Sequence, residues 1–212
     1  MFVTSERPVE ELLPARRTLP GLRRAAAGCR ACDLWRTGTQ TVFGEGPSRA
    51  RVVMAGEQPG DREDRQGRPF VGPAGALLDR ALGDAGIDRS LVYVTNVVKH
   101  FKWRASGKRR IHQRPGRGEV DACMPWLEAE LDAIHPDALV LLGATAAQAV
   151  FGSSFRVGEH RGEVLSSRLG PPALITVHPS SLLRLPEDED RHAALAAFVT
   201  DLRHVLPYMD GS

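Results

Sequence analysis

Four short apolar runs, separated by segments in which apolar residues recur at helical spacing, constrain the fold more than any other feature of this sequence. The runs are RVVMAG, LVYVTNVV, ALVLLG and ALITV, at residues 51–56, 91–98, 138–143 and 173–177. Apolar residues fill each run without alternating with polar ones, which is typical of strands buried on both faces of a parallel sheet. We therefore expect an α/β protein, a three-layer α/β/α sandwich with a central four-stranded parallel sheet.

The segments between these runs carry their own signals. Residues 74–86 have helical spacing and end on Gly86, a common residue at the end of a helix. Residues 119–134 also predict a helix, in which Pro125 is expected in the first turn or at a kink. A turn is expected at HRGEV, residues 160–164.

The length of the chain and its hydropathy pattern limit its organisation. A chain of 212 residues is long enough for one substantial core, so we expect a single domain over residues 1–212, with residues 1–36 as a lead-in segment that contains three prolines. No apolar run approaches the roughly 18 residues of a membrane helix, and the first residues lack the pattern of a signal peptide. We expect a cytoplasmic monomer that uses no membrane, and no site for a protein partner is evident.

Polar residues follow three of the four runs directly. GEQPGD supplies Glu57, Gln58 and Asp61 after the first run, Asn96 closes the second, and HPSSLLR begins with His178 after the fourth. Ligands of parallel α/β proteins bind at the carboxyl ends of the strands, so these side chains are candidates for a common pocket. Each also has an ordinary structural explanation as a turn, cap or strand terminator. Phe70, in RPFVGPAG, is by default a core aromatic residue.

The three cysteines suggest a metal site. Cys29 and Cys32 form a C-x-x-C pair, Cys123 lies far along the chain, and His100 is a candidate fourth ligand. Zinc and iron-sulfur clusters both accept such a set, and the spacing does not choose between them. A thioredoxin-like redox pair is less favoured because this C-x-x-C does not follow a strand. Cys123 has a plainer alternative, as a small buried apolar residue.

One decapeptide, KRRIHQRPGR at residues 108–117, concentrates positive charge around a single histidine, His112. Since the whole chain has a net charge of only +2, attraction to a polyanion must come from such local clusters. We expect a long basic loop over residues 99–118 that binds phosphates in a salt-dependent way; a merely solvated charged loop is the alternative. The cations are Lys108, Arg109, Arg110, Arg114 and Arg117.

Five separated motifs resemble those of the uracil-DNA glycosylase superfamily, and within it the UdgX family most closely. They are GEQPGDRED, RPFVGPAG, YVTNVVKH, KRRIH and HPSSLLR, in this order. The UdgX family is related to the iron-sulfur family 4 uracil-DNA glycosylases, from which this sequence departs in three places. Gln58 stands where family 4 typically has a small residue, His100 stands where it has a cysteine, and the KRRIH segment is additional.

The resemblance implies a DNA repair enzyme of base excision, a glycosidase that removes uracil from damaged DNA, with single-stranded DNA preferred. It implies a structural [4Fe-4S] cluster, with iron bound by Cys29, Cys32, His100 and Cys123. It further implies that Phe70 stacks on uracil, that Asn96 reads the base edge, and that Gln58 and His178 surround the base. We expect DNA contacts from Lys108, Arg109, Arg110, Ser180 and Arg184.

The UdgX family is unusual because its loop histidine becomes covalently joined to the abasic sugar, which implies a DNA-protein crosslink through His112 here. Donors from His178 and from backbone amides near Gln58 are expected to stabilise the departing uracil anion. Neighbouring cations are expected to favour the neutral, nucleophilic imidazole. Glu57, Gln58 or Asp61 is expected to orient His112 or accept its proton, and the sequence does not rank them. The rival hypotheses are an ordinary turnover glycosylase and a non-catalytic metal-bearing module that binds nucleic acid.

Overall fold

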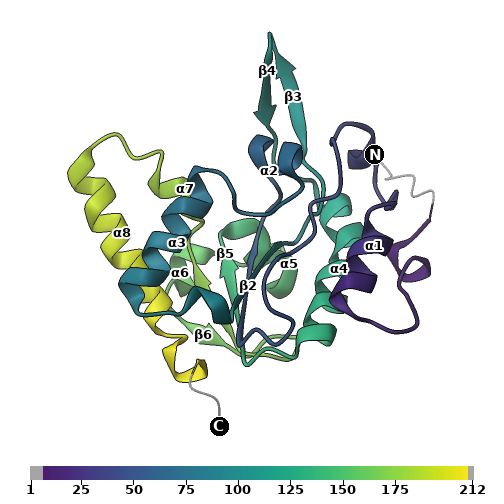
Figure 1. The fold of residues 1–212 in the computed structure, drawn as a ribbon. Helices are drawn as coiled ribbons and strands as arrows, with labels where there is room; N and C mark the ends of the chain where they lie inside the picture. Colours follow the sequence, from purple (N-terminus) through teal and green to yellow (C-terminus); the bar gives the residue numbers. More distant parts are fainter. Residues whose placement is uncertain (1–6, 210–212) are drawn as a thin grey trace.

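A mixed sheet of five strands in the order β2-β1-β5-β7-β6 forms the middle layer of the protein. The computed structural model describes residues 7–209 and is drawn in Figure 1. The strands are β1 (Val52–Gly56), β2 (Val92–Asn96), β5 (Ala138–Leu142), β6 (Val164–Leu165) and β7 (Ala173–Thr176).

The four predicted strands are confirmed, and they run parallel to one another. The prediction of a purely parallel four-stranded sheet is wrong in one respect, because β6 adds a fifth strand antiparallel to β7. This strand is only two residues long and half-buried, and it begins at Val164, the last residue of the segment expected to be a turn. A strand this short at the edge of a sheet leaves no apolar run in the sequence.

Alternate residues along the strands face two separate hydrophobic cores. Val53 of β1 belongs to one core, with α4 (Arg117–Ile134), α5 (Ala144–Phe151) and α1 (Leu19–Ala26). Met54, its neighbour, belongs to the other, with α3 (Pro73–Ala85) and α8 (Asp188–Arg203). Figure 1 shows the two groups of helices on opposite sides of the sheet, which confirms the three-layer α/β/α architecture.

The described part of the lead-in segment packs against α4, mainly through α1. Residues 1–6 lie outside the described range. The small helices of the chain are η1 (Val9–Glu11), η2 (Asp33–Arg36), α2 (Asp61–Gln66), η3 (Arg89–Leu91), α6 (Val157–His160), α7 (Pro179–Leu182) and η4 (Leu206–Tyr208). No helix within residues 7–209 is both long enough and apolar enough to cross a membrane.

Two helix predictions have different outcomes. Helix α3 ends as expected at Gly86, whose φ of 80° suits a residue without a side chain. Pro125 does not lie in the first turn of α4, because this helix begins at Arg117 and continues past the proline to Ile134. The proline therefore occupies the helix interior, where it removes one backbone hydrogen bond, and the alternative of a kink at this position stays a prediction.

The basic segment is not the expected loop. Its central part is an antiparallel hairpin of β3 (Trp103–Ser106) and β4 (Arg109–His112), which projects from the body of the protein in Figure 1. Gly107 and Lys108 form its two-residue turn, with a φ of 59° at Gly107. A glycine with positive φ at the first turn position is typical of a type II′ hairpin turn.

The carboxyl ends of the parallel strands meet at one edge of the sheet. Gly56 pairs with Asn96 at the ends of β1 and β2, and Leu142 pairs with Thr176 at the ends of β5 and β7. The motifs that follow these strands therefore come together, as the sequence predicted.

Candidate active site

Three of the predicted site residues converge on Gly56, the last residue of β1. A Cβ atom added to Gly56 would lie 2.5 Å from Asn96 Oδ1, 2.9 Å from Phe70 Cζ and 3.4 Å from His178 Nε2. The two shorter distances are below any normal carbon contact, so only glycine permits this approach. The three side chains border a cavity of about 360 Å³, a volume that suits a small planar ligand.

Phe70 is held in an unusual conformation at this cavity. Its φ is 55°, and its carbonyl oxygen lies only 1.7 Å from the place where a Cβ of Gly75 would be. Positive φ at an aromatic residue is strained, and strain of this kind clusters at functional sites. The ring is half-buried and stacks towards His178, with centroids 6.2 Å apart and an interplanar angle of 27°. Phe70 is therefore not the ordinary core residue that its spacing alone suggested.

His178 presents a hydrogen-bond donor to the same cavity. Its Nδ1 accepts the backbone N–H of Ser180 at 3.1 Å, so this nitrogen carries no proton. Burial outweighs the opposing effect of the Glu57 charge and, with smaller decreases from Arg184 and His112, lowers the pKa of His178 to about 4. The ring is therefore neutral near pH 7, with its proton on Nε2, the atom that lies beside Gly56.

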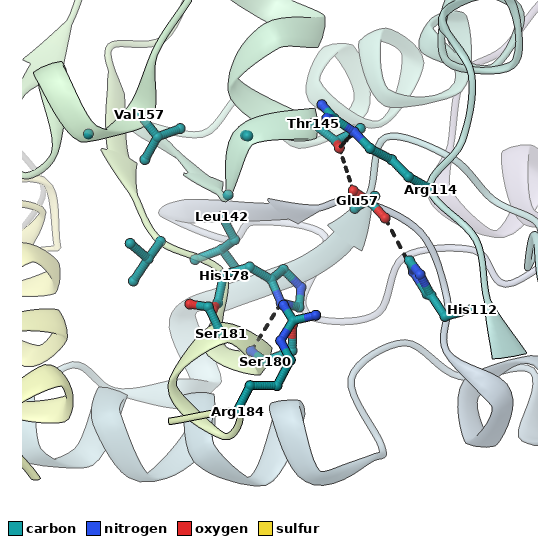
Figure 2. Close-up of a pocket in the computed structure, with 14 residues that line it drawn as sticks. Glu57, His112, Arg114, Leu142, Thr145, Val157, His178, Ser180, Ser181 and Arg184 are labelled. Carbon is teal, nitrogen blue, oxygen red and sulfur yellow. Dashed lines mark hydrogen bonds and ion pairs between the residues drawn. The ribbon is translucent and has the colours of Figure 1, made fainter. Parts of the chain in front are cut away.

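Glu57 and His112 form the centre of the site in Figure 2. His112 Nε2 lies 3.2 Å from Glu57 Oε1, while Thr145 donates its hydroxyl proton to Glu57 Oε2. Burial raises the pKa of the Glu57 carboxyl, but the bonds from His112 and Thr145 outweigh this effect, and the pKa lies below its usual value. Thr145 in turn accepts a bond from Arg114 Nε at 3.1 Å. Glu57 is thus an ionised, firmly oriented partner of the half-exposed imidazole.

A wider cavity of about 820 Å³ adjoins the first. The two cavities share His112, His178 and Ser180. Arg184 borders the wider one and donates to Ser180 Oγ at 3.4 Å (Figure 2). A cation and a hydroxyl therefore lie beside the smaller cavity, where both can donate hydrogen bonds to a phosphate of a bound strand.

Gln58 borders the smaller cavity, but its side-chain amide is engaged by the base of the hairpin. Its Oε1 accepts the N–H of Lys102 at 3.1 Å, and its Nε2 donates to the carbonyls of Lys102 and Gln113 at 3.2 and 3.0 Å. These bonds join both strands of the hairpin to the loop that carries Glu57.

Arg110 has a different environment from the one expected of a phosphate-binding cation. Its guanidinium lies 2.5 Å from Asp61 Oδ1 and 2.6 Å from Asp64 Oδ2, and its side chain is only 13% exposed. The two carboxylates neutralise the charge and tie the hairpin to α2, so the assignment of Arg110 to DNA phosphates does not fit. Asp61 is committed to arginines rather than to His112. Lys108 and Arg109 are exposed at the hairpin tip and form no ion pair with a described residue.

The cysteine set is buried and closely grouped. Burial raises the pKa of Cys32 to about 11 against the opposing effect of a bond from the Leu34 backbone, and the nearby Cys29 makes a smaller contribution in the same direction as burial. Burial likewise raises the pKa of Cys123, with smaller contributions from the other two thiols. Two sulfurs already accept N–H bonds, Cys123 from the Lys99 backbone at 3.2 Å and Cys29 from Trp126 Nε1 at 3.3 Å. Buried thiolates need such bonds, or a metal, to offset their desolvation.

His100 has a nitrogen suited to a metal. The Thr41 hydroxyl donates to the carbonyl of Ala26, so it accepts a bond from His100 Nε2 at 3.0 Å and leaves Nδ1 without a proton. Burial lowers the pKa of His100 to about 4, against a weaker opposing effect of Asp64, which keeps the ring neutral as a ligand must be. No three histidine, cysteine or carboxylate side chains among residues 7–209 are arranged to hold one metal ion. The donor chemistry fits an iron-sulfur cluster, whose several irons spread the ligands over a larger volume.

Sequence reasoning did not identify three residues that shape the site: Gly56, Arg114 as a partner of Thr145, and Thr145 itself. Thr145 had a usable signal, because it lies in the first turn of the helix that follows the buried run ALVLLG, at the carboxyl end of a parallel strand. Gly56 had a weaker one, as a glycine closing another buried run.

Comparison with known proteins shows the family to which this chain belongs. Residues 43–203 match the family model of the uracil DNA glycosylase superfamily. A type-4 uracil-DNA glycosylase of Thermotoga maritima is 41% identical over 79% of this chain and 84% of its own length. A type-4 enzyme of Sulfurisphaera tokodaii is 32% identical over 92% and 91%, and a type-5 uracil-DNA glycosylase of Pyrobaculum aerophilum is 32% identical over 77% and 76%. With most of its length matched in this way, the chain belongs to the uracil-DNA glycosylase superfamily.

Proposed function

We propose that this protein excises uracil from DNA, preferably from single strands, and is then joined covalently to the abasic sugar through His112, as in the UdgX family. Its place in the superfamily supports the excision of uracil. The observation that carries the trapping step is the position of His112, 3.2 Å from Glu57 and on the border of both cavities.

Base recognition uses the smaller cavity. Phe70 stacks on uracil and Asn96 bonds its polar edge, while His178 donates its Nε2 proton towards a uracil oxygen. The bond between N1 and C1′ breaks with its electron pair on uracil. The neutral His178 stabilises this anion by a hydrogen bond and keeps its proton. A preorganised donor of this kind contributes about 3 to 4 kcal/mol to such a reaction.

The trapping step uses the pair of Glu57 and His112. Glu57 takes the Nε2 proton, and the freed lone pair forms a bond to C1′ of the cationic sugar. In the neutral ring with its proton on Nε2, Nδ1 carries none, so the product is a neutral alkylated imidazole. Glu57 then passes its proton to solvent, and the uracil anion takes up a proton from water. This bond has no easily activated leaving group, so the enzyme is consumed after one turnover.

Binding of the strand uses cations that are free for it. Lys108 and Arg109 at the hairpin tip, together with Arg184 and Ser180 beside the wider cavity, contact phosphates. Arg110 is instead assigned to holding the hairpin on α2. We also propose that the protein acts in the cytoplasm as a monomer.

We further propose that Cys29, Cys32, His100 and Cys123 hold a [4Fe-4S] cluster. The grouping of three buried thiols and a neutral imidazole supports this assignment. When bound, the cluster would supply a structural cross-link between the lead-in segment, the end of β2 and α4.

A stoichiometric assay tests the proposal. A molar excess of single-stranded DNA with one uracil is incubated with the protein and resolved by denaturing electrophoresis, with a thymine strand as the control. We expect a heat-stable adduct equal in amount to the enzyme, and no adduct with thymine. In His112→Ala, water takes the vacant place, so we expect free abasic product and no adduct.

The other two outcomes correspond to the rival functions. Abasic product in excess of wild-type enzyme without an adduct indicates an ordinary turnover glycosylase. Absence of uracil release indicates a binding module without catalysis. An adduct that persists in His112→Ala removes His112 as the nucleophile.

A further inference from the structure

A buried ion pair joins the end of β2 to helix α4 and has no part in the reaction described above. Lys99 Nζ lies 2.6 Å from Glu130 Oε2, and the two side chains are 1% and 0% exposed. The described residues hold no other lysine that is buried to this extent.

Every hydrogen of the ammonium group has a partner. Besides Glu130, Lys99 Nζ donates to Thr95 Oγ1 at 2.6 Å and to the backbone carbonyl of Asn96 at 2.8 Å. Glu130 Oε1 accepts the N–H of Gly44 at 3.1 Å and the hydroxyl of Tyr93 at 2.9 Å. A network with all its bonds made is rigid, because any shift would leave a buried charge without a partner.

Such a pair needs a reason other than stability. Removing two charges from water costs about as much as their attraction returns, so apolar residues of similar volume usually serve a core as well or better. Buried ion pairs are better explained where they fix one geometry among several. In this protein the Lys99–Glu130 pair fixes the geometry of Asn96, because Lys99 donates a hydrogen bond to the backbone carbonyl of Asn96 at the end of β2.

Lys99 also stands between the two functional regions. Its side chain holds the carbonyl of Asn96, while its backbone N–H bonds the sulfur of Cys123 on α4. Asn96 borders the smaller cavity, and its Oδ1 lies beside Gly56. The orientation of the Asn96 amide depends on its backbone, since a short side chain at a strand end has few other directions.

We infer that the Lys99–Glu130 pair is a positioning device that orients the Asn96 amide for the uracil edge. Through this pair, the orientation of Asn96 in the smaller cavity depends on the position of α4 and Cys123. This inference rests on the proposed function, in which Asn96 reads the base. It gives the cysteine-bearing region a part in recognition in addition to its part in the fold.

The test variant is the double substitution Lys99→Met with Glu130→Gln. Methionine fills the volume of the lysine stem without a donor, and glutamine still accepts from Gly44 and Tyr93. Lys99→Met alone is unsuitable, because it leaves the Glu130 charge buried and unpaired. The double variant therefore removes the bond to Asn96 without that penalty.

Binding of free uracil to the purified holoprotein is the main readout. Loss of one positioning bond is expected to weaken it about tenfold, while iron content, melting temperature and affinity for uracil-free single-stranded DNA stay near the wild-type values. A structural role alone would lower stability and both affinities together. Unchanged uracil affinity in a folded, iron-replete double variant overturns the inference.

A matched control is the pair Arg161 and Asp201, whose carboxylate is also largely buried and accepts the Thr176 hydroxyl two residues before His178. Arg161→Met with Asp201→Asn is expected to leave uracil affinity unchanged; an equal loss in this control also overturns the inference. If wild-type protein fails to bind uracil, the proposed function falls. The side-chain NH₂ signals of Asn96 in NMR spectra then decide the inference alone: broadening in the Lys99 and Glu130 double variant supports it, and identical signals refute it.

Discussion

His112 Nε2 lies 3.2 Å from Glu57 Oε1, and this contact joins the hairpin to the carboxyl end of β1. The two residues are 55 positions apart in the chain, and their pairing depends on how the hairpin stands on the body. The sequence did not show which of three residues would meet His112, and the structure gives each of the three a different partner. Glu57 meets the imidazole, Gln58 holds the base of the hairpin, and Asp61 holds Arg110.

The first prediction concerns Glu57→Gln. The amide still bonds the Thr145 hydroxyl but cannot take the proton from His112, so we expect the rate of adduct formation to fall about 100-fold. Rapid-quench kinetics with excess enzyme over uracil-bearing single-stranded DNA measure this rate. Uracil binding, measured separately, is expected to change little, and an adduct rate within twofold of wild type would contradict the role of Glu57.

The second prediction concerns Gln58→Ala. Loss of the three bonds to Lys102 and Gln113 loosens the base of the hairpin, so His112 reaches the sugar less often before water does. The ratio of adduct to free abasic product is expected to fall on the order of 10- to 100-fold, because catalytic geometry is sensitive to displacements near 1 Å. Denaturing gels with a quantified abasic product give this ratio.

Gln40→Ala is the matched control for Gln58→Ala. The amide of Gln40 also donates to two backbone carbonyls, those of Asp64 and Arg65, but on α2 and away from the hairpin base. Its product ratio is expected to equal that of the wild type. A similar fall in both variants would mean that general loosening, and not the hairpin base, decides the outcome.

The sheet and the strand-end residues were predictable because their causes are local. A buried parallel strand needs a continuous apolar run, and parallel strands bring their carboxyl ends to one edge, which places Glu57, Asn96 and His178 together. The hairpin was not predictable in the same way. Its strands carry arginines on both faces, which hides the alternation, and Gly107 with Lys108 is a brief signal within a charged segment.

The burial of Arg110 could not be predicted from the sequence, because it depends on ion pairs with residues far along the chain. Asp61 and Asp64 lie 49 and 46 positions from this arginine, and no pattern in either segment marks one cation of the basic cluster for burial. The register of the hairpin decides which arginine is buried. Arg110 pairs with Ala105 and lies on the same face as His112 and Trp103. Side chains on one face of a strand alternate with those on the other, so Arg109 points away.

The third prediction concerns pH and His178. In the unfolded chain this residue titrates near 6.5, whereas in the folded protein burial lowers its pKa to about 4. Between these values the unfolded state binds more protons, so the free energy of unfolding falls as the pH drops from 6.5 to 4, by at most about 3 kcal/mol from this group. Urea unfolding at pH 7 and pH 4.5 is expected to show a smaller loss in His178→Gln than in wild type. Equal losses would show that His178 is not buried as a neutral ring.

The fourth prediction separates the two kinds of cation in the hairpin. Lys108→Ala with Arg109→Ala removes two exposed charges, so the slope of log affinity against log salt for single-stranded DNA is expected to shrink by about 0.7 per lost phosphate contact. The adduct rate at saturating DNA should stay near wild type, because His112 keeps its support. Arg110→Met should do the reverse: its charge is already neutralised by Asp61 and Asp64, so the salt slope remains while the adduct rate falls. Fluorescence anisotropy titrations at several salt concentrations, with the gel assay beside them, measure both quantities. A salt slope reduced by Arg110→Met as much as by the double variant would return Arg110 to the phosphate-binding set.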